Sequence, residues 1–131
     1  MFYIIDSYAW VEYFLGSRKG EVLRVLFLDE KNRFYTIECC LAEIKGWSLR
    51  ERKAFDELFA IIRTNSTMLP LNEQDWINAG QERFEQRKTR AQFGLIDATL
   101  LVKQKELSCK IISGDPHFRG LKDIVFLEQD N

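Results

Sequence analysis

Short apolar runs alternate with longer helical patterns along the chain, and this alternation limits the possible folds more than any other feature. Apolar runs typical of short buried strands occur at residues 2–5, 34–36, 68–71, 110–112 and 125–127. Helical patterns separate most of these runs, so consecutive strands need crossover connections and pair in parallel. The sequence therefore predicts an α/β domain in which helices cover both faces of a central, mainly parallel sheet of about four to five strands.

Apolar side chains at helical spacing define the expected helices. Trp10 and Tyr13 share one helical face directly after Asp6. Asn72 is followed three residues later by Asp75, which predicts the capped start of a long helix. Further helices are expected around residues 22–26, through residues 40–47, as one charged amphipathic helix over residues 49–62, and over residues 95–106.

Length and charge limit the classes of function. The chain has 131 residues, 46% of them hydrophobic and 30% charged, which predicts a single globular domain over residues 1–131. The net charge of −1 excludes a strongly basic, non-specific nucleic-acid binder. The apolar start lacks the basic residues of a signal peptide and is interrupted by Asp6, so we expect a cytoplasmic protein without a membrane anchor. Cys39, Cys40 and Cys109 contain no CxxC pair, which argues against a zinc site or a disulfide framework.

Four acidic residues occupy positions that ordinary surface acids seldom have. Asp6 follows the first apolar run directly, and Asp115 follows the run at 110–112 after two residues. Ligands of open parallel sheets bind at these carboxyl ends of strands. Glu43 lies on or beside the apolar stripe of its helix, and Asp97 lies among apolar or small neighbours. If the four acids converge, a bound divalent cation would relieve their repulsion, and oxygen ligands favour Mg²⁺ or Mn²⁺.

Each acid also has a structural interpretation. Asp6 could cap the helix that follows it, and Asp97 could complement a helix dipole. Glu43 could be an edge residue whose carboxylate reaches water, and Asp115 could be a turn residue before Pro116. Singly these interpretations are at least as good as a functional one, but together they leave the pattern of acids to chance.

Three segments resemble the motifs of PIN-domain nucleases, in the same order and at similar intervals. "YIIDSYAWVEYF" resembles the opening strand, acid and helix of that family, and "TIECCLAEIKGW" is similar to its second motif. "GLIDATLLVKQKELSCKIISGDPHF" resembles its C-terminal half. The short chain is most similar to the VapC toxins of toxin–antitoxin pairs. The resemblance implies a three-layer α/β/α fold, a homodimer, an antitoxin partner, and Mg²⁺- or Mn²⁺-dependent cleavage of single-stranded RNA.

The same resemblance assigns roles to individual residues. The four acids Asp6, Glu43, Asp97 and Asp115 match the family's catalytic, metal-holding positions. In such a site one or two metal ions lower the pKa of a water molecule and offset charge on the phosphate. Ser7 and Ser113 match the polar positions that hydrogen-bond the carboxylates or a water on the metal. His117 follows Pro116 and could bond a phosphate or a site carboxylate, or only the local backbone.

Contacts with RNA and the exact class of function stay open. Four cations precede Asp97 and could hold the RNA backbone, although a solvated helix face explains each of them as well: Arg83, Arg87, Lys88 and Arg90. The leading interpretation is a metal-dependent ribonuclease toxin. The alternatives are a housekeeping PIN nuclease that processes RNA without an antitoxin, and a PIN module that binds RNA or protein without catalysis.

Overall fold

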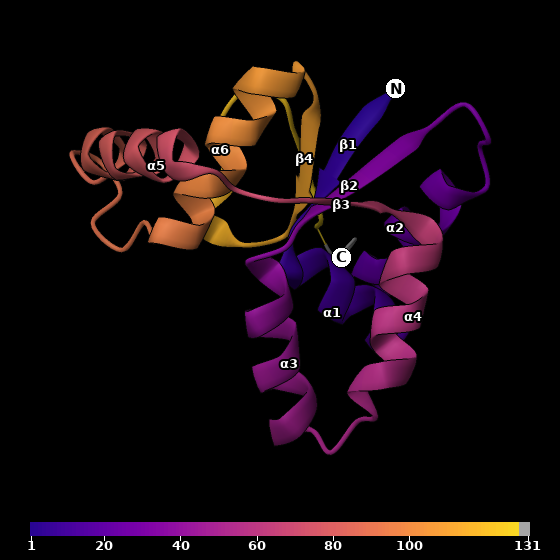
Figure 1. The fold of residues 1–131 in the computed structure, drawn as a ribbon. Helices are drawn as coiled ribbons and strands as arrows, with labels where there is room; N and C mark the ends of the chain where they lie inside the picture. Colours follow the sequence, from indigo (N-terminus) through magenta and orange to yellow (C-terminus); the bar gives the residue numbers. More distant parts are fainter. Residues whose placement is uncertain (129–131) are drawn as a thin grey trace.

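A single parallel sheet forms the centre of the molecule. The structure is a computed structural model that describes residues 1–128. Within this range, five strands pair in parallel in the order β3-β2-β1-β4-β5 (Figure 1). The strands are β1 (Phe2–Ile5), β2 (Arg33–Ile37), β3 (Thr67–Leu69), β4 (Lys110–Ser113) and β5 (Ile124–Phe126). The predicted α/β class and the parallel sheet are therefore confirmed.

Helices connect the strands and pack on the sheet. They are α1 (Ser7–Leu15), α2 (Arg18–Phe27), α3 (Cys40–Arg50), α4 (Phe55–Asn65), α5 (Glu73–Gln86) and α6 (Leu95–Leu107), with the short 3-10 helix η1 (Pro116–Phe118) after β4. The predicted cap of α5 is present, because the Asn72 side chain accepts a hydrogen bond from the Asp75 N–H and Asp75 returns one to the Asn72 N–H. No helix among residues 1–128 is long and apolar enough to cross a membrane.

The prediction of one helix over residues 49–62 is wrong. α3 ends at Arg50, and the chain turns through residues 51–54 before α4 begins at Phe55. Arg52 has a φ of 54°, a left-handed conformation that a helix interior excludes. Residues 50–53 are all charged, so this stretch offers no apolar side chain that would hold a continuous helix against the core. α3 and α4 therefore form a hairpin at one end of the sheet (Figure 1).

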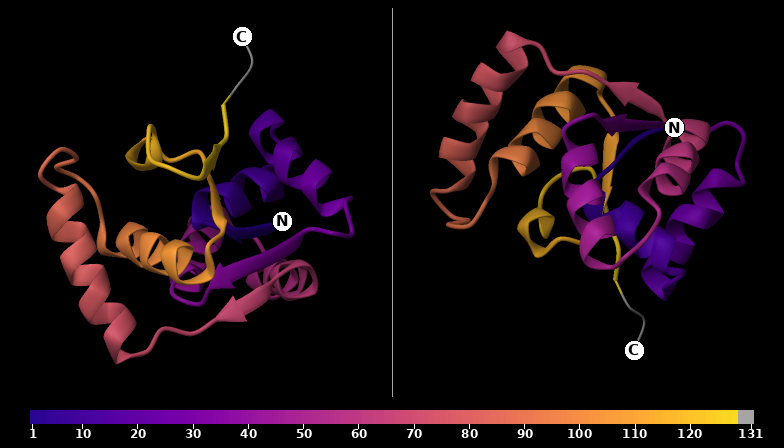
Figure 2. Two further views of the ribbon diagram at one scale, coloured as in Figure 1. Left: turned by 90° about the horizontal axis from the view of Figure 1, so that it is seen from above. Right: turned by 60° about the horizontal axis from the view of Figure 1, so that its bottom comes forward.

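Alternating strand side chains build two cores, one on each face of the sheet. Ile5 of β1 lies in the core beneath α1, α2 and α4, which also contains Trp10 and Leu23. Ile4 points to the opposite face, where it joins Leu100 in the core beneath α5 and α6. Figure 2 shows these two groups of helices on opposite sides of the sheet. The arrangement confirms the expected three-layer α/β/α architecture.

The order of the strands reverses between β1 and β4. β2 and β3 extend the sheet on one side of this pair, and β5 extends it on the other. Ile5 pairs with Ile112, so the two residues that follow, Asp6 and Ser113, lie side by side at the carboxyl edge. The Asp6 N–H donates a hydrogen bond to the Ile112 carbonyl at 3.2 Å. This reversal is the place where open parallel sheets bind ligands, and Asp115 follows two residues later.

Candidate active site

Asp6 is a buried carboxylate at the reversal point of the sheet. Its side chain is 3% exposed and accepts a hydrogen bond from the Ala9 N–H at 2.8 Å, so it caps α1. Burial raises the pKa of Asp6 to about 8, a hydrogen bond from Ser113 opposes this rise, and the charges of Asp115 and Asp97 add to it. The interpretation of Asp6 as a helix cap is therefore confirmed. Its carboxyl group is also close enough to Asp97 and Asp115 for their charges to act on it.

Asp97 and Asp115 meet around the imidazole of His117. The Asp97 Oδ2 lies 2.9 Å from His117 Nδ1, and the Asp115 Oδ1 lies 3.5 Å from the same nitrogen. Each of the three residues can offer a ligand atom within 4.8 Å of the other two. All three side chains are partly buried, so the cluster borders solvent and an ion can reach it. Sequence reasoning left His117 undecided because its partner Asp97 is 20 residues away in the chain.

Local backbone contacts hold the two aspartates in place. Asp97 lies in the first turn of α6, where it complements the helix dipole, and it accepts a hydrogen bond from the Gly94 N–H at 3.2 Å. Asp115 accepts one from the His117 N–H at 2.9 Å, and the Ser113 hydroxyl accepts one from the Asp115 N–H at 3.0 Å. Structural and functional interpretations of these acids are thus compatible, because each cap or turn also fixes the direction of a carboxylate.

Glu43 approaches the site from the exposed edge of α3. Because the residue is exposed, it lies beside the apolar stripe of the helix and not on it. Its stem leaves α3 one position before the buried Ile44, and its Oε1 accepts a hydrogen bond from the Ser7 hydroxyl at 2.8 Å. The alternative interpretation, an edge residue whose carboxylate reaches water, fits this geometry.

The four acids share one electrostatic environment. The pKa of Glu43 is raised by partial desolvation at the site and by the charges of Asp97 and Asp115, and the Ser7 hydrogen bond opposes the rise. Burial also raises the pKa of Asp97, against the hydrogen bond from His117. Asp6, Glu43 and Asp97 therefore each cost free energy to ionise in this site. Closely spaced carboxylates of this kind, with one imidazole, are the donor set of a hard divalent cation.

A small pocket of about 250 Å³ opens beside the acids. Three of its lining residues belong to the candidate site, namely Ser7, Glu43 and Asp115. The sequence reasoning missed three other lining residues. They are Tyr8 from α1, and Trp47 and Arg50 from α3. Trp47 and Arg50 lie one and two turns beyond Glu43 on the same helix, a spacing that could have identified them.

The four cations expected near RNA have mixed environments. Arg87 donates to the Phe93 carbonyl at 2.8 Å, and Arg90 donates to the Arg119 carbonyl at 2.9 Å, so both hold the loop before α6. Lys88 forms an exposed ion pair with Glu85 at 2.9 Å. Contact of these residues or of Arg83 with RNA stays a prediction.

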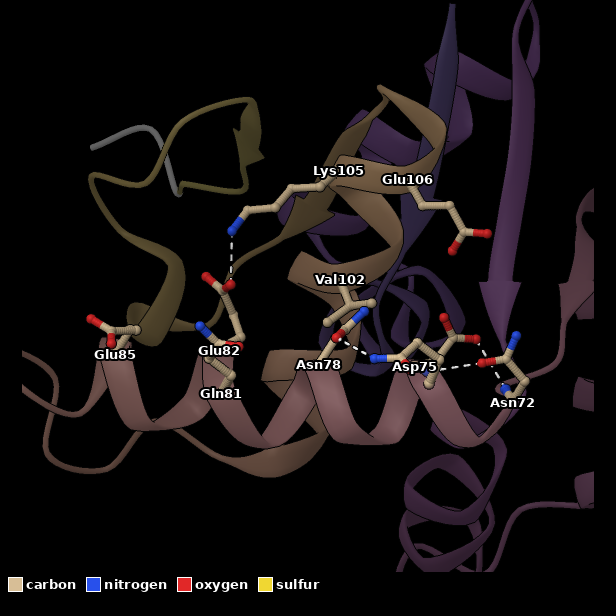
Figure 3. A pocket seen from close by; sticks show the side chains of 10 residues that line it. Asn72, Asp75, Asn78, Gln81, Glu82, Glu85, Val102, Lys105 and Glu106 are labelled. Carbon is tan, nitrogen blue, oxygen red and sulfur yellow. Dashed lines mark hydrogen bonds and ion pairs between the residues drawn. The ribbon is translucent and has the colours of Figure 1, made fainter.

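A larger pocket, of about 820 Å³, lies away from the acids between α5 and α6. Figure 3 shows amide and carboxylate side chains of α5 along one wall of this pocket. Lys105 of α6 reaches across to Glu82 of α5 in an ion pair of 2.7 Å (Figure 3). None of the four candidate acids lines this groove.

Comparison with solved structures identifies the fold. No protein-family model matches the sequence, and no curated protein matches it. The structure is similar to VapC20 of Mycobacterium tuberculosis, described as a toxin that cleaves the sarcin-ricin loop, with a TM-score of 0.76 and 14% sequence identity over 96% of this chain and 99% of that one.

Two complexes give the same result. A chain of VapBC2 from Rickettsia felis, bound to a promoter DNA fragment, matches with a TM-score of 0.70 and 13% identity over 96% of this chain and 97% of that one. A chain of VapBC-1 from Haemophilus influenzae matches with a TM-score of 0.65 and 18% identity over 99% of this chain and 98% of that one. The chain therefore has the PIN-like fold of VapC proteins, as its motifs predicted.

Proposed function

We propose that the protein is a divalent-metal-dependent endoribonuclease that cleaves single-stranded RNA, and that it is the toxin of a VapBC-type pair. The observation that carries this proposal is that Asp97 and Asp115 meet within ligand distance at the reversal point of a VapC-like sheet. Asp6 follows β1 at this point, and Glu43 lines the same small pocket as Asp115. The similarity of fold supports the proposal, and the chemistry of the acids gives it a mechanism.

Mg²⁺ or Mn²⁺ fits this group of side chains. The pKa values of Asp6, Glu43 and Asp97 are all raised, so these side chains resist ionisation, and a bound cation would favour their ionised form. Ligand atoms of Asp97, Asp115 and His117 are close enough together to reach one ion. When bound, a divalent ion activates water and offsets the charge that develops on the phosphate.

The remaining residues of the site orient the carboxylates. The Ser7 hydroxyl holds Glu43, and Ser113 holds both the Asp6 side chain and the Asp115 N–H. His117 bonds Asp97 and approaches Asp115 through the same nitrogen, which keeps the two aspartates in register. These contacts fix the acids before RNA arrives, so little reorganisation is needed during reaction. No nucleophilic side chain is required.

A cytoplasmic homodimer controlled by a small antitoxin is the cellular form that we propose. Solved structures with the same fold include a toxin–antitoxin complex from Klebsiella pneumoniae, matched with a TM-score of 0.67 and 12% identity over 97% of this chain and 98% of that one. An antitoxin that covers the acids would keep the enzyme inactive until the antitoxin is lost.

The nuclease proposal is tested by incubating purified protein with single-stranded and structured RNA in Mg²⁺, Mn²⁺ or EDTA. We expect cleavage that requires metal and falls by at least about a hundredfold in Asp97→Asn, because a carboxylate of the site is lost. Asp56→Asn is the matched control, since Asp56 also lies in the first turn of a helix but on α4. Cleavage that survives EDTA, or equal cleavage by Asp97→Asn, contradicts the proposal.

The toxin proposal has a separate test in cells. Induced expression of the natural chain is expected to arrest growth, and Asp6→Asn is expected to restore it. Asn also caps helices well, so this variant removes the carboxyl group that could hold a metal and keeps the fold. If both constructs grow equally well while the purified enzyme cleaves RNA, the protein is a nuclease and not a toxin.

A further inference from the structure

A pocket of about 370 Å³ adjoins the candidate active site. Tyr8 lines this pocket and also the small pocket that contains Glu43 and Asp115. The turn after β4 also borders both pockets. Gly114 and Pro116 line the 370 Å³ pocket, and Asp115 lines the small pocket with Glu43. The two pockets are therefore neighbours on either side of Tyr8, and we call this one the Lys19–Arg119 pocket.

Two cations line the Lys19–Arg119 pocket. Lys19 of α2 donates a hydrogen bond to the Tyr8 hydroxyl at 2.8 Å, and Arg119 follows η1. The two side chains come from segments 100 residues apart. The pKa of Lys19 is raised, chiefly by the hydrogen bond to Tyr8, and the charge of Arg119 opposes this rise. Because both cations line one pocket, an anion held between them would be attracted to both.

The same pocket has aromatic walls. The Lys19 ammonium lies 5.3 Å from the Tyr8 ring centroid, and the Arg119 guanidinium lies 4.4 Å from that of Phe126. A Cβ atom on Gly114 would lie only 2.4 Å from the Tyr8 ring. Glycine is therefore needed for the ring to pack against the turn that carries Asp115, and this contact fixes the ring beside the acids.

One carboxylate partly balances the positive charge. Glu128 forms an ion pair of 2.7 Å with Arg119, but both side chains are more than 60% exposed. Exposed pairs of this kind contribute little stability, so a phosphate can replace the carboxylate as the partner of Arg119. Lys19 bonds the uncharged Tyr8 hydroxyl, and the Glu12 carboxylate near it accepts a hydrogen bond from the Ser17 hydroxyl.

We propose that the Lys19–Arg119 pocket binds the nucleotide next to the scissile bond of single-stranded RNA. Its backbone phosphate bonds Lys19 and Arg119, and its base stacks on the Tyr8 ring. Cations interleaved with aromatic rings are the general means by which proteins hold single strands. With a net charge of only −1, the protein needs such a local site to approach RNA. This inference rests on the proposed nuclease function and adds its substrate contact.

Kinetics on a single-stranded RNA oligonucleotide test the pocket. The double variant Lys19→Gln/Arg119→Gln is expected to raise KM at least about tenfold with kcat nearly unchanged, because two charged hydrogen bonds to phosphate are lost. The salt dependence of binding should also become shallower. Tyr8→Leu should raise KM more than Tyr8→Phe does, since only leucine removes the stacking surface.

Two control variants match the cations that are changed. Arg63 also lies over an aromatic ring, 4.8 Å from the Phe59 centroid, but it belongs to α4. Lys105 forms its ion pair in the groove between α5 and α6 (Figure 3). Arg63→Gln and Lys105→Gln are expected to leave KM unchanged. A KM of the double variant equal to that of these controls overturns the inference.

Binding to the same oligonucleotide separates this inference from the proposed function. Affinity is measured in EDTA, where no cleavage is expected. If the natural protein binds RNA through Lys19 and Arg119 but never cleaves it, the nuclease proposal fails and the pocket stands. If it cleaves RNA but the double variant binds equally well, only the pocket fails. If it does not bind RNA at all, both are wrong.

Discussion

Replacing Asp6 by Asn should make the metal-free protein more stable at neutral pH. The pKa of Asp6 is raised by burial from 3.8 to about 8, so the folded state binds a proton that the unfolded state has released between these values. Stability from this group is complete below about pH 4 and is lost as pH rises toward 8. The Asn side chain does not titrate and can still accept the hydrogen bond from the Ala9 N–H.

The size of the effect follows from the same shift. Each pH unit between the two pKa values corresponds to about 1.4 kcal/mol. From pH 5 to pH 7, the natural protein should therefore lose about 3 kcal/mol relative to Asp6→Asn. Urea unfolding in EDTA at several pH values measures the free energy of unfolding of both proteins. The reasoning is refuted if the difference between the two free energies does not change with pH.

Two further predictions concern helix packing. Gly20→Ala should cost about 2 kcal/mol of stability in urea unfolding, because the new Cβ atom would lie 2.2 Å from the Glu12 carbonyl oxygen of α1. The control Gly80→Ala should be neutral or stabilising, because a Cβ atom there meets nothing within 4 Å. Lys103 and Asp75 form a buried ion pair of 3.0 Å. Lys103→Met should lower stability by about 3 kcal/mol in the same assay, because it leaves the Asp75 carboxylate without a cation. An unchanged midpoint of urea unfolding would refute this.

The ends of strands and helices could be predicted where residues of the same segment mark them. The apolar run of β1, followed directly by Asp6, marks both the end of a strand and the start of a helix, and Asn72 with Asp75 marks the start of α5. The break between α3 and α4 has no such signal. Arg52 adopts a left-handed conformation without being Gly or Asn, so the charged segment looked like the interior of one helix.

The site was predictable only in part, for a physical reason. Acids at strand ends or in helix caps carry a local signature, which pointed to Asp6, Asp97 and Asp115. Their partners are set by tertiary packing: Ser7 and Glu43 meet across 36 residues. A charged residue at the rim of a pocket has the same helical spacing as one facing the core, so the exposure of Glu43 needed the structure. The catalytic roles of all these residues stay proposals.

Direct binding of Mn²⁺ tests the central claim that the four acids form one divalent-cation site. Titration of the metal-free protein at pH 7, followed by calorimetry or by the electron paramagnetic resonance of free Mn²⁺, should show saturable binding. Asp97→Asn should weaken this binding strongly and Asp56→Asn should not, because only Asp97 lies among the converging acids. Absence of saturable binding, or equal affinity in both variants, would contradict the account.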